Sequence, residues 1–117
     1  MYQYKAIVER VVDGDTIDVM ADLGFHVWTK QRLRLYGIDA YESRTRDLEE
    51  KKKGLAAKAF VENRCPVGNS IIVEITKLEG KYGRAIAKVY TNNIDDTVDI
   101  SINDQLVNEG LAVYKDY

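Results

Sequence analysis

Two aspartates flank a glycine at residues 13–15, within the segment VVDGDTIDVM. Asp13-Gly14 is a common dipeptide in hairpin turns, so turn formation alone would explain it. Asp15, however, stands directly before an alternating strand pattern, where its carboxylate could serve as one ligand of a metal site. Other residues of the chain must decide between these two interpretations.

Three later segments carry further acids and arginines that could act together with Asp15. Taken singly, each has an ordinary structural explanation: Asp39 could cap a strand end, Arg34 could face solvent, and Glu42 could be an exposed loop acid. The segments are RLRLYGIDAYE at residues 32–42, SRTRD at 43–47 and KYGR at 81–84. Their chemistry depends on whether the fold brings them together.

The composition narrows the chemistry that is open to this chain. The single cysteine, Cys65, excludes an internal disulfide and a cysteine-rich zinc site, and we expect a buried, inert thiol. The single histidine, His26, excludes a two-histidine metal site, and we expect it in a loop or at a strand end. Catalysis must therefore depend mainly on carboxylates, arginines, lysines and tyrosines. The net charge of −2 does not by itself indicate a nucleic-acid partner.

The hydropathy pattern predicts five strands and two helices in a single domain, residues 1–117. Three strands come first, then a helix, two more strands and a last helix. This order predicts an α+β, mainly β fold, with a five-stranded barrel of the oligonucleotide/oligosaccharide-binding (OB) type. The predicted strands are 2–12, 16–21, 27–38, 70–77 and 84–90, and the predicted helices are 49–64 and one that Ser101 caps and Gly110 ends.

Alternation and helical spacing also predict which faces are buried. On the second strand Ile17 and Val19 should point to the core, so Asp18 on the opposite face is expected to be solvated rather than a metal ligand. The predicted apolar stripe of the first helix consists of Leu55, Ala56, Ala59 and Phe60.

Taken together, these motifs resemble the staphylococcal nuclease (thermonuclease-like) family. VDGDT, the run R-L-Y-G-I-D-x-x-E and KYGR occur in the family's order and at closely similar spacing, and the likeness extends to NEGLAVY at residues 108–114. The resemblance implies a five-stranded OB barrel with two helices. Because the chain ends at Tyr117, where the long form of the family continues into another helix, we expect a short-form member. The resemblance also implies a calcium-dependent phosphodiesterase that acts on DNA or RNA.

The resemblance assigns a set of protein ligands for Ca²⁺. In the family's pattern the ligands are the carboxylates of Asp15 and Asp39 and the backbone carbonyl of Ala40, while Asp13 and Glu42 act through waters. Oxygen donors of this kind favour Ca²⁺ or Mg²⁺ over softer metals. The residue types therefore agree with the assignment.

Catalytic and substrate-binding roles follow from the same resemblance. Glu42 would act as general base on a water, and Arg34 and Arg84 would clamp the phosphoryl oxygens as negative charge develops. The 5′ P–O bond would be cut with little sequence preference, leaving 3′-phosphates. The positions that match nucleotide contacts of the family are Lys81, Tyr82 and Tyr114.

Two departures from the family's pattern lead to further expectations. Tyr41 occupies the position of the proline that usually precedes the catalytic glutamate, so we expect a less rigid turn and a lower rate. The chain is mildly acidic, whereas secreted members tend to be strongly basic. We therefore expect weak, salt-sensitive capture of nucleic acid.

Two other functions are compatible with the sequence. The main alternative is a non-catalytic nucleic-acid-binding module on the same fold, although the joint presence of all five expected metal-binding and catalytic side chains favours an enzyme. The acidic segment 92–117 suggests a protein-interaction barrel as a third.

The sequence also leads to expectations about partners and location. We expect a single-stranded or frayed substrate, and a monomer as the default state. No membrane contact is expected, since no apolar run approaches the ~20 residues of a membrane helix. No leader pattern precedes the first strand, so a cytoplasmic location is expected unless a leader was removed.

Overall fold

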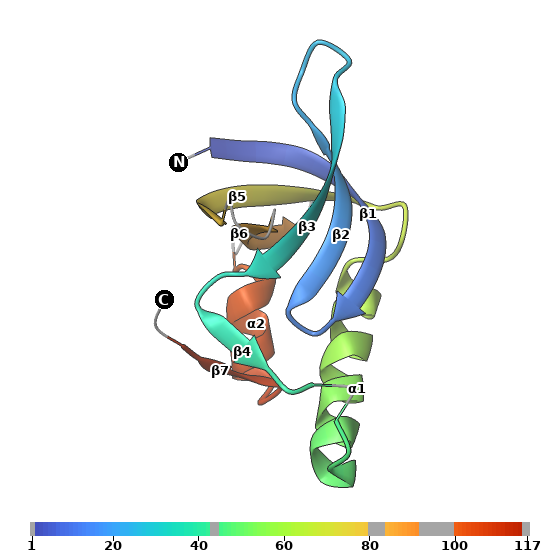
Figure 1. Cartoon of the computed structure of the whole chain (residues 1–117), viewed down its shortest axis with the longest axis vertical. Coiled ribbons are helices and arrows are strands. Elements are labelled where there is room, and N and C mark those ends of the chain that lie inside the picture. Colours follow the sequence, from blue (N-terminus) through green and yellow to red (C-terminus); the bar gives the residue numbers. More distant parts are fainter. Residues whose placement is uncertain (1, 43–44, 80–83, 92–99, 116–117) are drawn as a thin grey trace.

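The computed structural model describes residues 2–42, 45–79, 84–91 and 100–115. These residues form a closed five-stranded barrel, two helices and a separate two-stranded sheet (Figure 1), which confirms the predicted mainly β barrel fold. The elements are β1 (Tyr2–Asp13), β2 (Thr16–Asp22), β3 (Trp28–Leu35), β4 (Ile38–Ala40), α1 (Leu48–Arg64), β5 (Ser70–Glu79), β6 (Arg84–Thr91), α2 (Ile102–Asn108) and β7 (Ala112–Tyr114).

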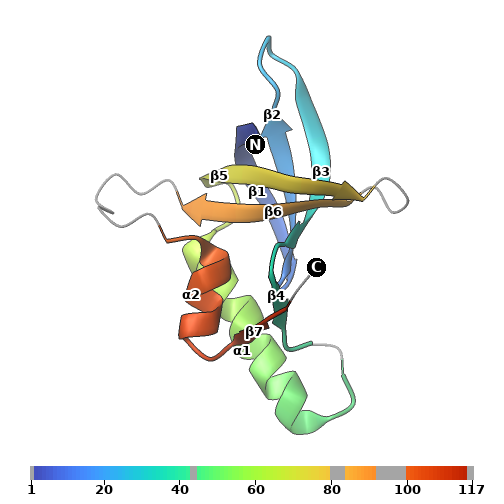
Figure 2. The ribbon, with the colours of Figure 1, turned by 90° about the vertical axis from the view of Figure 1, so that its left-hand side faces the viewer.

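The barrel closes in the strand order β1-β2-β3-β6-β5, with β5 pairing back onto β1. Neighbouring strands are antiparallel except β3 and β6, which run parallel, with Arg32 opposite Arg84. Strand β1 is long enough to pair with both β2 and β5, and its register shifts between Val8 and Arg10 and again between Val11 and Asp13. Such bulges bend a strand, which allows β1 to curve around the barrel (Figure 1). Figure 2 shows the neighbouring strands β5 and β6 side by side, crossing in front of β1.

The barrel interior is filled by alternate apolar side chains, as the strand pattern predicts. Strand β2 alternates half-buried and buried side chains along its whole length, and Ile17 and Val19 are fully buried. The largest fully buried side chains elsewhere include Leu33, Leu35, Ile38, Ile71, Ile86, Ile102 and Leu106.

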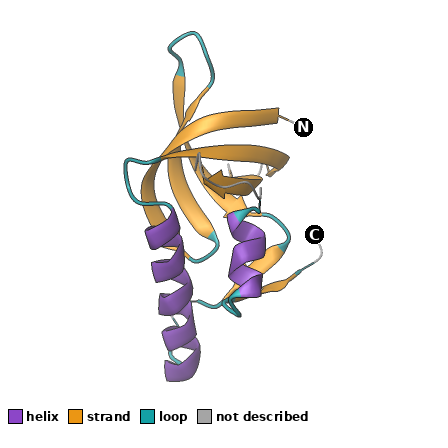
Figure 3. Ribbon diagram, turned by 180° about the vertical axis from the view of Figure 1, so that it is seen from behind, coloured by secondary structure: helices purple, strands orange, loops and turns teal. Residues whose placement is uncertain are grey.

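Helix α1 begins and ends at signals that the sequence carries. The Asp47 carboxylate accepts hydrogen bonds from the backbone N–H groups of Glu49 at 3.0 Å and Glu50 at 3.3 Å, and so caps the helix. Cys65 follows the last helical residue and precedes Pro66. Both helices lie at the same end of the barrel, opposite the tip of the β2–β3 hairpin (Figure 3).

The predicted buried face of α1 is wrong. The buried residues are Gly54, Ala57 and Val61, whereas Leu55 is 49% exposed and Ala56 and Ala59 also face solvent. Phe60 is half-buried against the core. Ala57 faces the barrel because the helix packs very closely on Gly14 of the β1–β2 turn, and Leu55 points outward.

The predicted strand 27–38 is in fact two strands. Strand β3 ends at Leu35, and Gly37 has a φ of +76°, a left-handed conformation that glycine adopts without strain. The chain then leaves the barrel as β4, which pairs antiparallel with β7, a strand that the sequence pattern did not predict. The turn at Gly37 therefore carries Asp39 away from the barrel wall.

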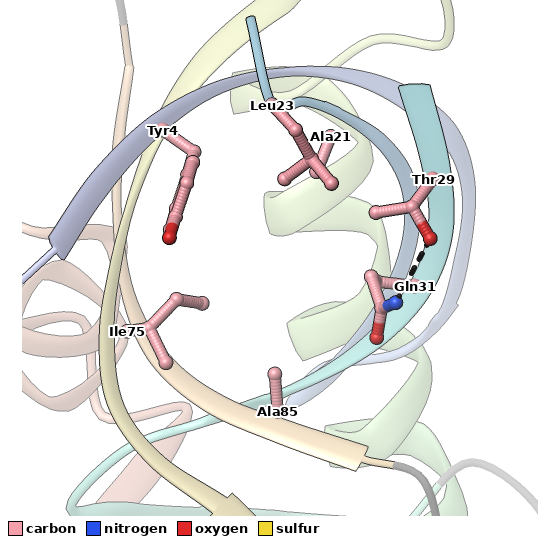
Figure 4. Close-up of a pocket in the computed structure, with 7 residues that line it drawn as sticks. All are labelled: Tyr4, Ala21, Leu23, Thr29, Gln31, Ile75 and Ala85. Carbon is pink, nitrogen blue, oxygen red and sulfur yellow. Dashed lines mark hydrogen bonds between the residues drawn. The ribbon is translucent and has the colours of Figure 1, made fainter. Parts of the chain in front are cut away.

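An apolar cavity of about 310 Å³ opens at the mouth of the barrel near the β2–β3 hairpin. Figure 4 shows its lining side chains pointing toward one another across the barrel. They are Tyr4, Ala21, Leu23, Thr29, Gln31, Ile75 and Ala85.

Three expectations about single features can be compared with the structure. Cys65 is buried, as expected, and burial raises the pKa of its thiol to about 11; its inertness stays a prediction. His26 lies in the exposed turn between β2 and β3, as expected. No helix in the described ranges is both long enough and apolar enough to span a bilayer.

Candidate active site

The turn between β1 and β2 packs against helix α1. The Asp13 carboxylate accepts a hydrogen bond of 3.0 Å from the Gly14 N–H, within the turn itself. Gly14 is buried, and a Cβ added there would lie 2.7 Å from the Cβ of Ala57 and 3.1 Å from the Cβ of Ala40. Its φ is not positive, so glycine is required here for close packing rather than for a left-handed turn. The turn is thereby held against both α1 and β4.

The Asp15 side chain is fixed by three donors. One carboxylate oxygen lies 2.7 Å from Nη1 of Arg34 and accepts a hydrogen bond of 3.3 Å from the Ala40 N–H. The other oxygen accepts a hydrogen bond of 3.1 Å from the Thr16 hydroxyl. Asp15 is therefore oriented toward β4, and its side chain is only 15% exposed.

Arg34 joins the two carboxylates that the family resemblance assigns to a metal. Its Nη1 pairs with Asp15, and its Nη2 lies 3.3 Å from Oδ1 of Asp39. The same nitrogen donates to the carbonyl of Ile38 at 3.3 Å. Arg34 is half-buried, and its single positive charge is shared between two acids, so the three side chains together keep one negative charge.

Strand β4 presents Asp39 outward and is held in place from the other end of the chain. Asp39 pairs with Val113 of β7, and the side chains of Ile38 and Ala40 on either side are buried. The Lys115 N–H donates to the carbonyl of Gly37 at 2.8 Å. Asp39 is 49% exposed, so it is the solvent-facing member of the acidic pair.

Asn103 of α2 hydrogen-bonds both to the segment that precedes β4 and to strand β6 of the barrel. This role was not predicted from the sequence. The Asn103 amide nitrogen donates to the carbonyls of Tyr36, at 2.8 Å, and Ala87, at 3.2 Å, and its oxygen accepts from the Val89 N–H at 3.2 Å. Asn103 is only 2% exposed. An asparagine in the apolar part of a short helix was the available signal, since a buried amide needs partners.

Glu42 and Tyr41 follow directly after β4. The Glu42 side chain is exposed, so solvent can reach the predicted base. Tyr41 is half-buried, and Nζ of Lys53 lies 5.1 Å above the centre of its ring. This contact attaches the residue before Glu42 to helix α1, in place of the stiffness that a proline would supply. The expected lower rate stays a prediction.

Tyr114 lies on β7 opposite Ile38, the residue before Asp39 on β4. Its ring is 64% exposed, and its hydroxyl donates to Oδ1 of Asp104 at 3.1 Å. That hydrogen bond to a carboxylate raises the pKa of the Tyr114 hydroxyl. The residue offers an exposed aromatic face with a fixed hydroxyl, and its predicted contact with a nucleotide stays a prediction.

Three other predicted residues are described less fully. Lys81 and Tyr82 lie outside the described residues. Arg84 is described by its backbone, which begins β6 and pairs with Arg32 of β3 and Glu79 of β5. The parallel register places this backbone beside the strand that carries Arg34.

The residue types near Arg34 suit a hard divalent cation. In the described ranges no group of three or more His, Cys, Asp and Glu side chains is placed to hold a metal ion. Asp15 and Asp39 are nevertheless within reach of one guanidinium. Two carboxylates completed by a carbonyl and waters fit Ca²⁺ or Mg²⁺, which accept such mixed oxygen ligands.

Asp18 is not simply solvated, in contrast to the prediction. It lies on the outer face of β2 as expected, but Nε and Nη2 of Arg32 donate to its two oxygens at 2.8 and 3.1 Å. The register places Arg32 directly opposite on β3. The hydrogen bond from Arg32 holds the pKa of Asp18 below its ordinary value.

Comparison with known proteins identifies a family and several relatives. The family model described as staphylococcal nuclease homologue matches residues 32–117. A thermonuclease of Staphylococcus intermedius is 31% identical over 111 residues, which cover 95% of this chain and 60% of that protein. Endonuclease YhcR of Bacillus subtilis (strain 168) is 28% identical over 116 residues, which cover 94% of this chain and 9% of that protein. Protein ParB of Escherichia coli is 36% identical over 92 residues, which cover 77% of this chain and 44% of that protein. The chain thus spans less than two thirds of the length of each.

Proposed function

Because the chain belongs to the staphylococcal nuclease family, we propose that it is a calcium-dependent phosphodiesterase that cleaves single-stranded or frayed DNA or RNA. The observation that carries the proposal is the position of Arg34, between the carboxylates of Asp15 and Asp39. This arrangement brings the expected metal ligands and one expected phosphate-binding group to a single point.

Asp15 and Asp39 would hold Ca²⁺ together with the Ala40 carbonyl, with Asp13 acting through water. A cation bound there would polarise the phosphate and offset charge that develops on it. Arg34 contacts both acids and offsets one of their two negative charges, so the remaining charge favours a bound cation. With the acids neutralised by a cation, the forked N–H groups of Arg34 become available to a phosphoryl group.

Arg34 and Arg84 would hold the phosphoryl oxygens from adjacent strands of the barrel. Their donors are planar and permanently charged, so these hydrogen bonds strengthen as negative charge gathers in the transition state. Tyr114 offers an exposed ring for stacking on a nucleotide. By the family resemblance, Lys81 and Tyr82 would also contact the nucleotide.

Glu42 would accept a proton from a water that attacks the phosphorus in line. The new bond joins the water oxygen to phosphorus, while the 5′ P–O bond breaks and the leaving 5′ oxygen takes a proton from solvent. The product then carries a 3′-phosphate. Glu42 is exposed and close in sequence to β4, which suits a base that must reach a water next to the bound phosphate.

The test is digestion of heat-denatured DNA, with calcium and with excess chelator. We expect cleavage that requires calcium and falls about 10²–10⁴-fold in Glu42→Gln. Glu62→Gln is the matched control, because Glu62 is an exposed acid on α1. Calcium-independent binding of DNA without any cleavage would instead establish a non-catalytic nucleic-acid-binding module.

A further inference from the structure

Strand β3 has two faces with different chemistry. Thr29 and Gln31 point into the barrel cavity, where the Gln31 amide donates to the Thr29 hydroxyl at 3.1 Å (Figure 4). Because side chains alternate along a strand, Trp28, Lys30 and Arg32 lie on the outer face. All three are exposed. We call these three residues the β3 stripe.

The β3 stripe leads directly to the candidate active site. Arg34 is the next residue on the same face of β3, and it contacts Asp15 and Asp39. Alternate residues of a strand are about 6.8 Å apart, similar to the spacing of phosphates in an extended single strand. A strand whose reacting phosphate is held at Arg34 could therefore place its next phosphates along Arg32 and Lys30.

The charge around Lys30 and Arg32 of the β3 stripe is positive, whereas Asp22 of β2 lies opposite Trp28. Arg10 of β1 is opposite Asp18 of β2, and Asp18 is opposite Arg32. Lys30 and Arg10 are both close enough to act on Asp18 electrostatically. Three cations thus surround one carboxylate. Asp18 holds the Arg32 guanidinium in a fixed direction through two hydrogen bonds and leaves its other N–H groups for a ligand.

Exposed aromatic side chains lie at the far end of the stripe. Trp28 is 44% exposed and Phe25, at the tip of the hairpin, is 99% exposed. Phe25 and His26 have φ values of 54° and 63°, which is uncommon for residues other than glycine. The tip is closed by backbone hydrogen bonds of 2.9 Å between Leu23 and Val27 and between Val27 and Gly24. The turn therefore holds a large aromatic ring out in solvent.

We propose that the β3 stripe is a binding surface for single-stranded nucleic acid that continues from the active site. Lys30 and Arg32 bind successive phosphates, and Trp28, followed by Phe25, stacks on bases. Cations in line with aromatic rings are the usual composition of surfaces that bind single strands without sequence preference. The direction of the strand from Arg34 rests on the proposed function, whereas binding to the stripe can be measured without cleavage.

The experiment measures binding by fluorescence anisotropy with labelled oligothymidylate in excess chelator, so that no cleavage occurs. The test variant is Trp28→Ala/Lys30→Gln. The control is Lys52→Gln/Leu55→Ala, which removes one exposed cation and one exposed apolar side chain from helix α1. Two lengths are compared, about 16 and about 4 nucleotides, which bracket the usual site sizes of OB folds.

We expect the test variant to bind the long strand about tenfold more weakly or worse, as loss of one stacked base predicts. The slope of log affinity against log salt should fall by about 0.7, as one lost phosphate contact predicts. The control should bind as the wild type does. Asp18→Asn should bind the long strand several-fold more tightly, because it removes the acid between the three cations.

Several results would overturn the inference. These are unchanged affinity in the test variant, an equal loss in the control, or an equal loss with the short strand. Competition by poly-glutamate as effective as competition by DNA would reassign the stripe to acidic proteins. Stripe-dependent binding without any calcium-dependent cleavage would refute the proposed function alone, and cleavage with stripe-independent binding would refute this inference alone.

Discussion

Substitution of Gly14 by alanine should destabilise the protein through one identifiable contact. The added Cβ would lie 2.7 Å from the Cβ of Ala57 and 3.1 Å from the Cβ of Ala40. Neither neighbour is the end of a flexible side chain, so α1 and β4 would have to shift. Overpacking of this kind costs about 1–3 kcal/mol of the free energy of unfolding. For a chain of this length each kcal/mol lowers Tm by roughly 4 °C.

The reasoning is tested by a double-mutant cycle with Ala57→Gly. That substitution alone should cost about 1 kcal/mol, because glycine disfavours the interior of a helix. In its presence Gly14→Ala should cost about 1–2 kcal/mol less than in the wild type, since the shortest contact is gone. Part of the cost should persist because of Ala40. Free energies of unfolding come from urea denaturation, where the slope is about 1–3 kcal/mol per molar.

Two results would refute this account of Gly14. Equal destabilisation by Gly14→Ala in both backgrounds would show that Ala57 is not the obstacle. No destabilisation at all would show that the turn moves freely. The packing also predicts a functional effect, because displacement of the turn separates Asp15 from the Ala40 N–H. The rate of cleavage should therefore fall by more than the smaller fraction of folded protein explains.

Three further predictions concern single side chains. Asn103→Ala should cost about 3 kcal/mol in urea unfolding, because buried backbone partners lose their hydrogen bonds; a loss below the error of the measurement would contradict its structural role. Arg34→Gln should reduce cleavage about 10²–10³-fold. The same substitution should tighten Ca²⁺ binding, measured by calorimetry, because it removes a competing cation. Weaker calcium binding would show that Arg34 does not compete. Burial raises the pKa of Cys65 from 9.0 to about 11, so the thiol ionises at a lower pH in the unfolded chain than in the folded protein. The stability that the buried, neutral thiol contributes is therefore lost as pH rises through that interval. Urea unfolding of wild type and Cys65→Ala on both sides of the interval should show the difference, and a parallel pH dependence of the two would disprove it.

Local patterns predicted the barrel because its strands are long and alternate regularly. Ile17 and Val19 of β2 show the alternation plainly, and Ser101 marks the start of α2 through its hydrogen bond to the Asp104 N–H. The buried face of α1 was not predictable in this way. The position of this face depends on Gly14, about forty residues before Ala57 in the chain. The spacing of residues within the helix carries no information about that neighbour.

The geometry of the candidate site was predictable only in part. The motifs indicated that Asp15 and Asp39 act together, but this came from resemblance rather than from pattern. Strand β4 has three residues, too few for a periodicity to be visible. Its partner β7 is equally short and lies more than seventy residues away. Pairings of that kind depend on tertiary structure, so neither the Arg34 bridge nor the Asn103 network could be expected from the sequence.

The parallel pairing of β3 with β6 has a consequence for folding. The paired residues Arg32 and Arg84 are about fifty positions apart, with α1 and β5 between them, so this contact closes a long loop and should form late. The two arginines expected to hold the phosphate belong to these two strands. A chain whose barrel has not yet closed therefore lacks the pair, whatever local structure it has formed. Partly folded molecules should be unable to cut nucleic acid, and the onset of cleavage during refolding should coincide with barrel closure.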